Sequence, residues 1–338
     1  MNAPAAFWTP LTDTTVQCLL CPHRCRIASG KRGRCGVREN QAGKLVSLIY
    51  SSCSSIAVDP IEKKPLFHFL PGSSVYSLGS VGCTMGCEHC QNYHIATATP
   101  ETYPLQDLPP KEAVAEAQQN NCAGIAWTYN EPTIWHEYVL DSARLAKDAR
   151  LATVSVTNGY INPEPLRTLA PYLDAMNIDV KAFTESFYQR VCKARLAPVL
   201  EACELAHSLG IHLEVTYLLI PGYNDTKEEL QKFCRWVADR LSVQTPVHFS
   251  RFHPDFRMTS VASTPLGILM QARSFAQEAG LQYVYLGNTP HDDYENTYCP
   301  TCHALLVERH GFAVRIVGLA DGRCSVCQTP IPVVTSLD

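Results

Sequence analysis

The sequence predicts an α/β protein built on a parallel sheet. Between residues 75 and 287, short apolar segments alternate with longer segments of helical pattern, which is the order of strands followed by helices. The chain has 338 residues, 46% hydrophobic and 18% charged, which suits one large globular domain with small additions. Because strand–helix–strand crossovers are right-handed, such a sheet curls toward a barrel.

The predicted strands and helices follow one another along the chain. The strands are residues 75–81, 124–128, 152–157, 173–180, 212–220, 246–252 and 282–286. The helices are residues 111–121, 134–149, 197–209, 227–241 and 266–279. Six or so such units are fewer than the eight of a closed barrel. The chain therefore divides into an N-terminal cysteine-rich module and connector (1–74), a core (75–290) and a C-terminal module (291–338).

The composition and charge of the chain indicate in which compartment the protein works and which partners it does not bind. A net charge of −4 argues against a nucleic-acid-binding surface. No segment approaches the roughly 18 apolar residues that cross a membrane, and the first residues lack the basic stretch of a secretory signal. We therefore expect a cytoplasmic protein, in which 16 cysteines indicate metal ligation rather than disulfides.

The N-terminal module contains four closely spaced cysteines with the pattern C-x2-C-x3-C-x9-C. They are Cys18, Cys21, Cys25 and Cys35. So short a segment folds poorly without a ligand, and four thiolates suit either zinc or an iron–sulfur cluster. Residues 44–50 are a predicted strand. Residues 57–68, with Pro60 and Pro65, are predicted to be an extended connector.

Directly after the first predicted core strand lie Cys83, Cys87 and Cys90, with the spacing C-x3-C-x2-C. Three thiolates on one loop can ligate three irons of a [4Fe–4S] cluster and leave the fourth iron without a protein ligand. An open coordination position is where a metal site performs chemistry. The alternative is a structural zinc site completed by His89 or His94.

The C-terminal module contains two C-x2-C pairs separated by 21 residues. They are formed by Cys299 and Cys302 and by Cys324 and Cys327, with short strands predicted at residues 305–308 and 312–317 between them. This is the pattern of a zinc-ribbon or rubredoxin-like module. We expect a structural zinc or iron ion there rather than an active cluster.

Polar residues gather where the core strands are predicted to end. They include Glu131, Asn158, Asp179, Lys181, Glu214, Thr216, Asp225, His248 and His253. Ligands of parallel α/β sheets bind at the carboxyl ends of the strands. Each group by itself is also typical of a cap or turn.

The three-cysteine spacing identifies the chain as a member of the radical S-adenosylmethionine (SAM) superfamily, and the strand-end motifs resemble its pyruvate formate-lyase-activating branch. Three further motifs resemble the AmmeMemoRadiSam system radical SAM enzymes: Cys-x2-Cys-Pro-His-x-Cys, residues 59–68 and His-Phe-Ser-Arg-Phe-His-Pro. The resemblance spans approximately residues 16–290. It implies a partial (β/α)6 TIM-type barrel.

The resemblance also implies a chemistry and a set of contacts. The cluster would bind SAM and cleave it reductively to a 5'-deoxyadenosyl radical that abstracts hydrogen. Glu131 would receive the SAM amino group, although Tyr129 and Asn130 replace the usual glycines. Asn158, Asp179 and Lys181 would line the ribose and carboxylate, His253 would lie near SAM, and His89 would occupy the place of an aromatic residue against adenine.

Three functions are consistent with these features. The first is a radical SAM enzyme that modifies a small molecule or protein side chain, for which the resemblance implies Memo-like and AMMECR-like proteins as partners. The second is an activating enzyme for a glycyl-radical enzyme; both would need a reductant such as flavodoxin or ferredoxin. The third is a non-catalytic iron–sulfur protein for electron transfer or redox sensing. No catalytic residue or substrate is indicated, and Cys53, Cys122, Cys192, Cys203 and Cys234 are expected to pack.

Overall fold

The computed structural model describes residues 2–289 and 292–337 and confirms the α/β class. Its centre is an eight-stranded sheet in the order β16-β15-β14-β13-β12-β11-β9-β8. The strands are β8 (Ser55–Pro60), β9 (Ser74–Gly79), β11 (Gly124–Trp127), β12 (Ala152–Thr157), β13 (Ala175–Asp179), β14 (His212–Leu219), β15 (Val247–Arg251) and β16 (Val284–Gly287). All neighbours from β9 to β16 pair in parallel, at the predicted places. The predicted boundary at residues 290 and 291 lies outside the described residues.

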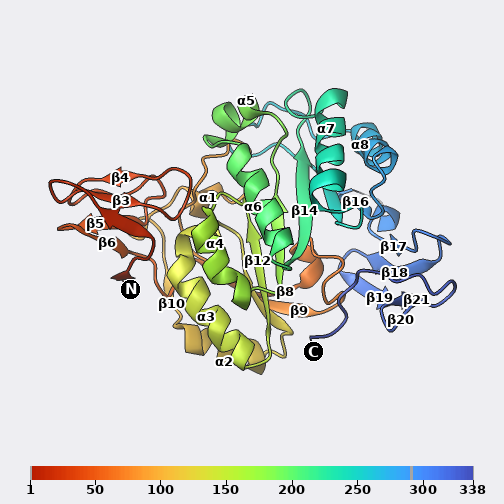
Figure 1. Ribbon diagram of the computed structural model, residues 1–338, viewed down its shortest axis with the longest axis horizontal. Helices are drawn as coiled ribbons and strands as arrows, with labels where there is room; N and C mark the ends of the chain where they lie inside the picture. Colours follow the sequence, from red (N-terminus) through yellow and green to blue (C-terminus); the bar gives the residue numbers. More distant parts are fainter. Residues whose placement is uncertain (1, 290–291, 338) are drawn as a thin grey trace.

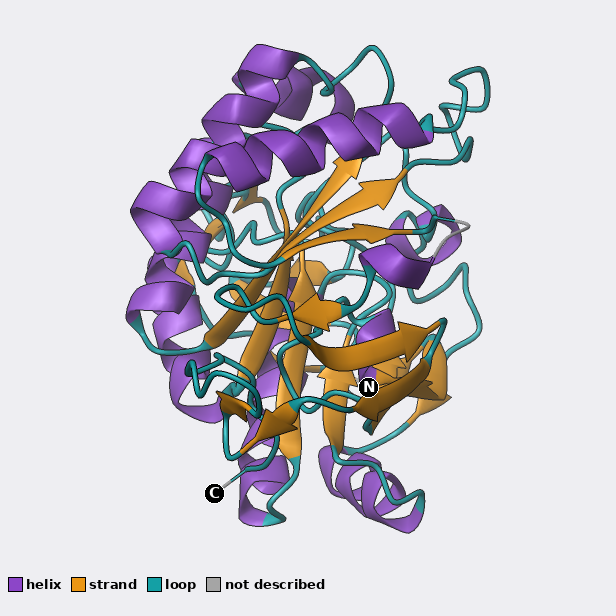
Figure 2. Cartoon of the chain, turned by 90° about the vertical axis from the view of Figure 1, so that its right-hand side faces the viewer, coloured by secondary structure: helices purple, strands orange, loops and turns teal. Residues whose placement is uncertain are grey.

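The longer helices lie on the outer face of these strands (Figure 2). They are α2 (Pro110–Gln119), α3 (His136–Asp148), α4 (Pro163–Leu169), α6 (Ala197–Ser208), α7 (Lys227–Trp236) and α8 (Leu266–Glu278). Shorter turns are α1 (Tyr93–Ala96), α5 (Glu185–Phe187), η1 (Ile61–Lys63), η2 (Pro132–Trp135), η3 (Ala170–Tyr172), η4 (Tyr188–Cys192), η5 (Val237–Leu241) and η6 (Asp292–Tyr294). Thr226 caps α7, since its hydroxyl accepts a hydrogen bond from the Glu229 backbone N–H at 3.3 Å. The sequence did not predict α4.

Strand β8 corrects the prediction of a connector over residues 57–68. It pairs antiparallel with β9, with Pro60 opposite Ser74. A proline is tolerated there because β8 is the edge of the sheet. Within the described residues β8 and β16 are not paired with each other, so the barrel is partial.

Residues 61–70, the plug segment, close the barrel at the end where the parallel strands begin. The side-chain amide of Asn177 donates to the Pro65 carbonyl at 2.7 Å. Leu66 and Phe69 pack in one cluster with small residues of the strands, namely Ala126, Ala152 and Ala175. These alanines leave room for the larger side chains, so the sheet wraps around the plug segment.

Glu214 is the main anchor of the plug segment. Its fully buried carboxylate accepts hydrogen bonds from the backbone N–H groups of Phe67 at 3.0 Å and His68 at 2.7 Å. It also contacts His212 Nε2 at 3.1 Å and His248 Nε2 at 2.6 Å. Glu214 and His248 lie near the starts of β14 and β15 rather than at their carboxyl ends, which corrects their grouping with the other strand-end residues.

The N-terminal module lies at one side of the core, and the C-terminal module at the other (Figure 1). Two three-stranded sheets form the first module: β1 (Ala3–Pro4), β6 (Lys44–Ser47) and β5 (Arg38–Gln41), and β2 (Trp8–Pro10), β3 (Val16–Cys18) and β4 (Arg26–Ile27). β7 (Ser52–Cys53) pairs with β10 (Gln106–Asp107). The predicted strand at 44–50 is thus the shorter β6. An ion pair of 2.7 Å between Arg38 and Glu137 of α3 ties this module to the core.

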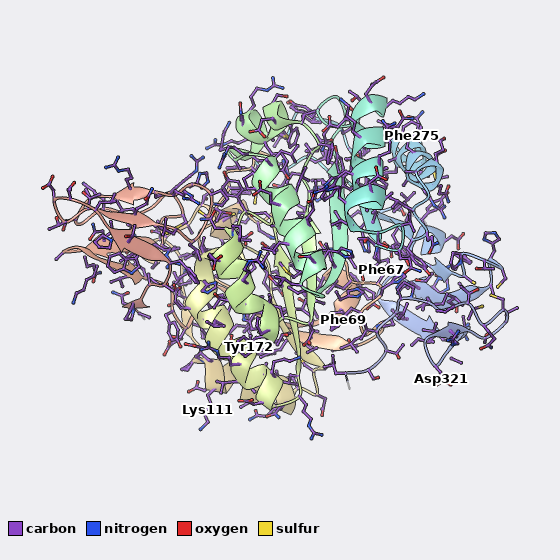
Figure 3. All side chains as sticks on the ribbon, in the orientation of Figure 1. Phe67, Phe69, Lys111, Tyr172, Phe275 and Asp321 are labelled. Atoms are coloured by element: carbon purple, nitrogen blue, oxygen red, sulfur yellow. The ribbon has the colours of Figure 1, made fainter. Side chains whose placement is uncertain are left out.

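The C-terminal module contains the predicted hairpin. Its strands are β17 (Thr297–Tyr298), β18 (Leu305–His310), β19 (Ala313–Ile316), β20 (Leu319–Ala320) and β21 (Arg323–Cys324). The plug segment joins it to the barrel: Arg309 donates to the Phe67 carbonyl at 2.7 Å, and Leu70 N–H to the Val334 carbonyl at 2.7 Å. Phe67 and Phe69 accordingly lie between the core and this module in Figure 3.

Candidate metal centre and cofactor site

The loop that carries Cys83, Cys87 and Cys90 leaves the carboxyl end of β9 and is held by backbone hydrogen bonds. Gly86 N–H donates to the Cys192 carbonyl at 2.9 Å, and Glu88 N–H to the Val191 carbonyl at 3.1 Å, both in the π-helical turn η4. Gly82 has φ +86°, and a Cβ atom there would lie 2.5 Å from the Cys35 carbonyl oxygen. Only glycine fits this position, so the loop and the N-terminal module are in direct contact.

Asn130 and Tyr129, which stand where the resemblance places two glycines, hold the start of the same loop. The Asn130 side chain accepts from Ser80 N–H and donates to the Gly82 carbonyl, each at 3.0 Å. Tyr129 has φ +71°, a conformation that favours glycine. Its hydroxyl donates to Asp59, and the Lys64 ammonium lies 4.8 Å from its ring centroid. These contacts offset the backbone strain.

The three thiols of the loop resist ionisation in the absence of a metal. Burial and the nearby Glu131 carboxylate raise the pKa of Cys83 well above its ordinary value, and burial raises the pKa of Cys90 to about 11. The Cys192 thiol and burial raise the pKa of Cys87, while Lys181 opposes the shift. Cys192 is buried as predicted, but its place beside Cys87 was not apparent from the sequence. Loading a metal must therefore release protons.

Two polar donors lie within reach of the Cys83 sulfur. The Asn158 side-chain amide is 3.5 Å from it, and the Met85 backbone N–H is 3.4 Å from it. The same amide lies 3.0 Å from the Thr84 hydroxyl, a contact that the sequence did not predict. Hydrogen bonds to the sulfurs are among the features that tune iron–sulfur clusters. These residues fit a thiolate-bound cluster.

Lys181 and Asp179 lie together at the end of β13. The Lys181 ammonium is 2.6 Å from the Asp179 carboxylate. Burial by itself would lower the pKa of Lys181, but Asp179 and Cys87 raise it above its ordinary value. Lys181 therefore stays protonated, and its ammonium, paired with Asp179, lies beside the cysteine loop.

His89 is buried, and it lies in the sequence between Cys87 and Cys90. Neither of its ring nitrogens has a hydrogen-bond partner among the described residues. Burial and the nearby Lys181 lower its pKa to about 3, so the imidazole is neutral at physiological pH. A buried neutral ring with unpaired nitrogens is suited to a bound ligand that offers a partner.

Glu131 is engaged by the protein itself. Its buried carboxylate accepts hydrogen bonds from Thr133 N–H at 2.9 Å, the Thr157 hydroxyl at 2.6 Å and Asn158 N–H at 2.9 Å. A carboxylate accepts about four such bonds, so one acceptor position remains. Glu131 fixes the backbone of Asn158, and its contact with SAM stays a prediction.

His253 lies in the exposed loop after β15. Its Nε2 atom is 2.9 Å from the side-chain nitrogen of Gln91, the residue that follows Cys90. In the same loop, Arg257 N–H donates to the Glu88 carbonyl at 3.0 Å. The structure thus brings His253 to the edge of the cysteine loop, and its role toward SAM stays a prediction.

The four C-terminal thiols form a compact group. All four sulfur atoms lie within 4.8 Å of one another, with Cys299 and Cys327 3.5 Å apart and Cys302 and Cys324 3.6 Å apart. Tetrahedral ligation with Zn–S bonds of about 2.3 Å separates the sulfurs by about 3.8 Å. The group is therefore suited to a single ion. It lies beyond the plug segment, at the opposite end of β9 from the cysteine loop.

We expect loss of this ion to destabilise the protein rather than to inactivate it. Cys324→Ser should lower the content of the bound zinc or iron and reduce the midpoint of thermal unfolding by about 5 °C or more, which corresponds to a loss of about 3.5 kcal/mol at an unfolding entropy of about 2.1 cal/mol/K per residue. Ser325→Ala, in the same turn, is the matched control. Loss of cluster-dependent activity in the folded Cys324→Ser variant would contradict this structural role.

The chain is similar to a known protein family and to a protein of an archaeon. The family model described as the radical SAM superfamily matches residues 78–237. The chain is 47% identical over 332 residues to the uncharacterized protein MJ0808 of Methanocaldococcus jannaschii, covering 98% of this chain and 99% of that protein.

Solved structures resemble it in fold. A radical SAM methyltransferase from Sphaerobacter thermophilus is 15% identical, with a TM-score of 0.50 over 64% of this chain and 66% of that one. A domain of a pyruvate-formate lyase-activating enzyme from Bacteroides vulgatus is 14% identical, with a TM-score of 0.44 over 49% of this chain and 99% of that one.

In the described part of the chain, no helix has the length and apolar character to cross a membrane.

Proposed function

Because the chain belongs to the radical SAM superfamily, we propose that Cys83, Cys87 and Cys90 hold a [4Fe–4S] cluster at which SAM is cleaved reductively. When bound and reduced by one electron, the cluster and SAM supply a 5'-deoxyadenosyl radical that abstracts a hydrogen atom from the substrate. The observation that carries this proposal is the cysteine loop, with Asn158 3.5 Å from the Cys83 sulfur and Lys181 beside Cys87.

The surrounding side chains would bind and orient SAM. Lys181 would pair with the carboxylate of the methionine moiety, and Asp179 would accept hydrogen bonds from the ribose hydroxyls. Asn158, held in place by Glu131, would contact both the cysteine loop and SAM. His89 would present its neutral ring to adenine. His253, at the edge of the loop, would cover the cofactor from the solvent side.

The test is an anaerobic assay for 5'-deoxyadenosine. The protein is reconstituted with iron and sulfide, reduced with dithionite and supplied with SAM. Formation of 5'-deoxyadenosine that depends on both reductant and SAM is the expected result. A fully loaded cluster that yields none of this product would overturn the proposal and favour the non-catalytic electron-transfer or redox-sensing alternative.

The Lys181→Met variant should weaken SAM binding. Loss of a charge-assisted contact costs about 1.5–3 kcal/mol, so the KM for SAM should rise about 10- to 100-fold while the cluster content is unchanged. Lys147→Met is the control, because Lys147 of α3 forms an ion pair of 2.6 Å with Asp174, which precedes the start of β13, whereas Lys181 follows the end of that strand. Equal KM values for SAM in both variants would show that Lys181 does not contact SAM.

Within the superfamily, the quoted motifs favour the AmmeMemoRadiSam system enzymes, which would act on a small molecule or protein side chain with flavodoxin or ferredoxin as reductant. Memo-like and AMMECR-like proteins would then be partners. The alternative is activation of a glycyl-radical enzyme. One measurement distinguishes these two functions. Cells that lack this protein would keep an active glycyl-radical enzyme if it modifies a small molecule or protein side chain, and would lose that activity if it is the activating enzyme.

A further inference from the structure

The four thiols of the N-terminal module line one cavity at the boundary with the core. Cys18, Cys21, Cys25 and Cys35 come from β3, the following loops and the turn before β5, and the cavity also receives Arg38. Burial raises the pKa of Cys21 above its ordinary value and that of Cys35 to about 11. Four thiols around one space, one on a buried cysteine and three on partly buried ones, are arranged for a common ligand.

The spacing of these thiols differs from that of the C-terminal group. Among the described residues, the C-terminal cysteines are the one group of three or more potential ligands whose atoms all lie within 4.8 Å of one another. Within the described residues, the N-terminal thiols do not form so compact a group, although all four line the same cavity. They are therefore less closely gathered than the four thiols suited to a single tetrahedral ion, which needs sulfurs about 3.8 Å apart.

The loop of Cys83, Cys87 and Cys90 provides an internal reference. Among the described residues, its three thiols likewise do not form so compact a group as the C-terminal cysteines. Each thiolate of a [4Fe–4S] cluster binds a different iron, so the sulfurs stand farther apart than around a single ion. The N-terminal spacing thus resembles that of the cluster loop and not that of the C-terminal ion site.

Arg38 is an independent observation that points to an anionic ligand. It is 1% exposed and lines the cavity. Its Nη2 atom binds the Ala6 carbonyl at 2.6 Å and Glu137 at 2.7 Å, but Nε and Nη1 have no partner among the described residues. Buried donors are rarely left unpaired. A cluster with four thiolates is anionic and offers sulfur acceptors for these two nitrogens.

The cavity adjoins the cysteine loop of the proposed SAM site. His23, between Cys21 and Cys25, donates from Nε2 to the Thr84 carbonyl at 2.7 Å. The Cys35 carbonyl lies against Gly82, which directly precedes Cys83. Cys35 of the N-terminal group and Cys83 of the cysteine loop are therefore connected through the contact between the Cys35 carbonyl and Gly82.

We propose that Cys18, Cys21, Cys25 and Cys35 hold a second [4Fe–4S] cluster, next to the cluster loop, rather than a zinc ion. The proposal does not depend on SAM cleavage, because it concerns a separate ligand set and is tested by metal and sulfide content. Failure of the 5'-deoxyadenosine assay would leave it standing.

The first test is the content of acid-labile sulfide in the anaerobically purified and reconstituted full chain. Two clusters give about eight sulfides and at least about eight irons per chain, with at most one zinc in the C-terminal group. About four sulfides together with zinc in the N-terminal module would overturn the proposal.

The second test locates the cluster. The Cys83→Ala/Cys87→Ala/Cys90→Ala variant should keep about four sulfides and a reducible cluster with an electron paramagnetic resonance signal. Cys21→Ser/Cys35→Ser should also lose about four sulfides, while Cys203→Ala, a buried cysteine of α6, should lose none. A triple variant that is folded by circular dichroism but free of sulfide would contradict the proposal. If it does not fold, the sulfide content of the unaltered protein decides.

A third measurement tests the placement beside Arg38. In the triple-cysteine variant, Arg38→Met should make the reduction potential of the remaining cluster more negative, because a cation that stabilises the reduced state is removed. Arg32→Met, in the same module but paired with Glu39 and Glu101 near the surface, should leave the potential unchanged. Equal potentials in the two variants would contradict a cluster in this cavity.

Discussion

Replacing Cys87 with alanine is expected to lower the rate of 5'-deoxyadenosine formation at least about a thousandfold, a loss of about 4 kcal/mol in transition-state stabilisation. Cys87 is the middle cysteine of the loop, and the remaining two thiols would not retain a cluster that needs three. The assay is the anaerobic one described above, with iron and sulfide measured on the same sample.

Cys234→Ala is the matched control for this variant. Cys234 is a fully buried cysteine of α7 and belongs to none of the three cysteine modules. It should keep full activity and full sulfide content, while Cys87→Ala should keep the ion bound by the C-terminal thiols. A Cys87→Ala variant that is as active as Cys234→Ala would exclude the loop as the cluster site.

The parts of the site that the sequence predicted are those encoded by local spacing. The cysteine loop and the C-terminal pairs are defined by intervals of two or three residues between cysteines. Such intervals can be read from the sequence without knowing how distant segments pair. The alternation of strands and helices is likewise local, and it placed each parallel strand to within a few residues.

The features that the sequence did not predict depend on pairing between distant segments. β8 is a strand because β9 lies beside it, and Pro60 at its end conceals this tendency. Cys192 is an ordinary packing residue by its local pattern, and only the folded chain brings η4 against Cys87. The gathering of the N-terminal thiols around one cavity is also a property of the fold alone.

The polar residues around the cysteine loop could be predicted only in part. The polarity of a side chain does not reveal at which end of the barrel it lies. Asn158 and Lys181 lie beside the cysteine loop. Glu214 and His248, of similar chemistry, face the plug segment at the other end. The difference is their position within the strand, which depends on boundaries that a pattern defines only to within a few residues.

The Glu214→Gln substitution is expected to destabilise the protein by about 3 kcal/mol or more at neutral pH. Four donors point at this buried carboxylate: two backbone N–H groups of the plug segment and the Nε2 atoms of His212 and His248. A glutamine offers one acceptor oxygen, and its amide group opposes the remaining donors. Breaking one side of a buried charged network costs about 3–5 kcal/mol. Denaturant unfolding of both proteins under anaerobic conditions measures the difference.

The pH dependence of this difference tests its electrostatic origin. Burial would raise the pKa of Glu214, but hydrogen bonds from His212 and His248 lower it well below its ordinary value. A depressed pKa in the folded state contributes stability above the unfolded value, about 4.3, and that stability is lost as the pH falls toward the folded value. The advantage of the unaltered protein over Glu214→Gln should therefore be constant near neutrality and shrink below about pH 4. Glu201→Gln, at an exposed site on α6, should change stability by less than about 0.5 kcal/mol at any pH. A Glu214→Gln deficit that stays the same in acid would contradict the role of the buried charge in anchoring the plug segment.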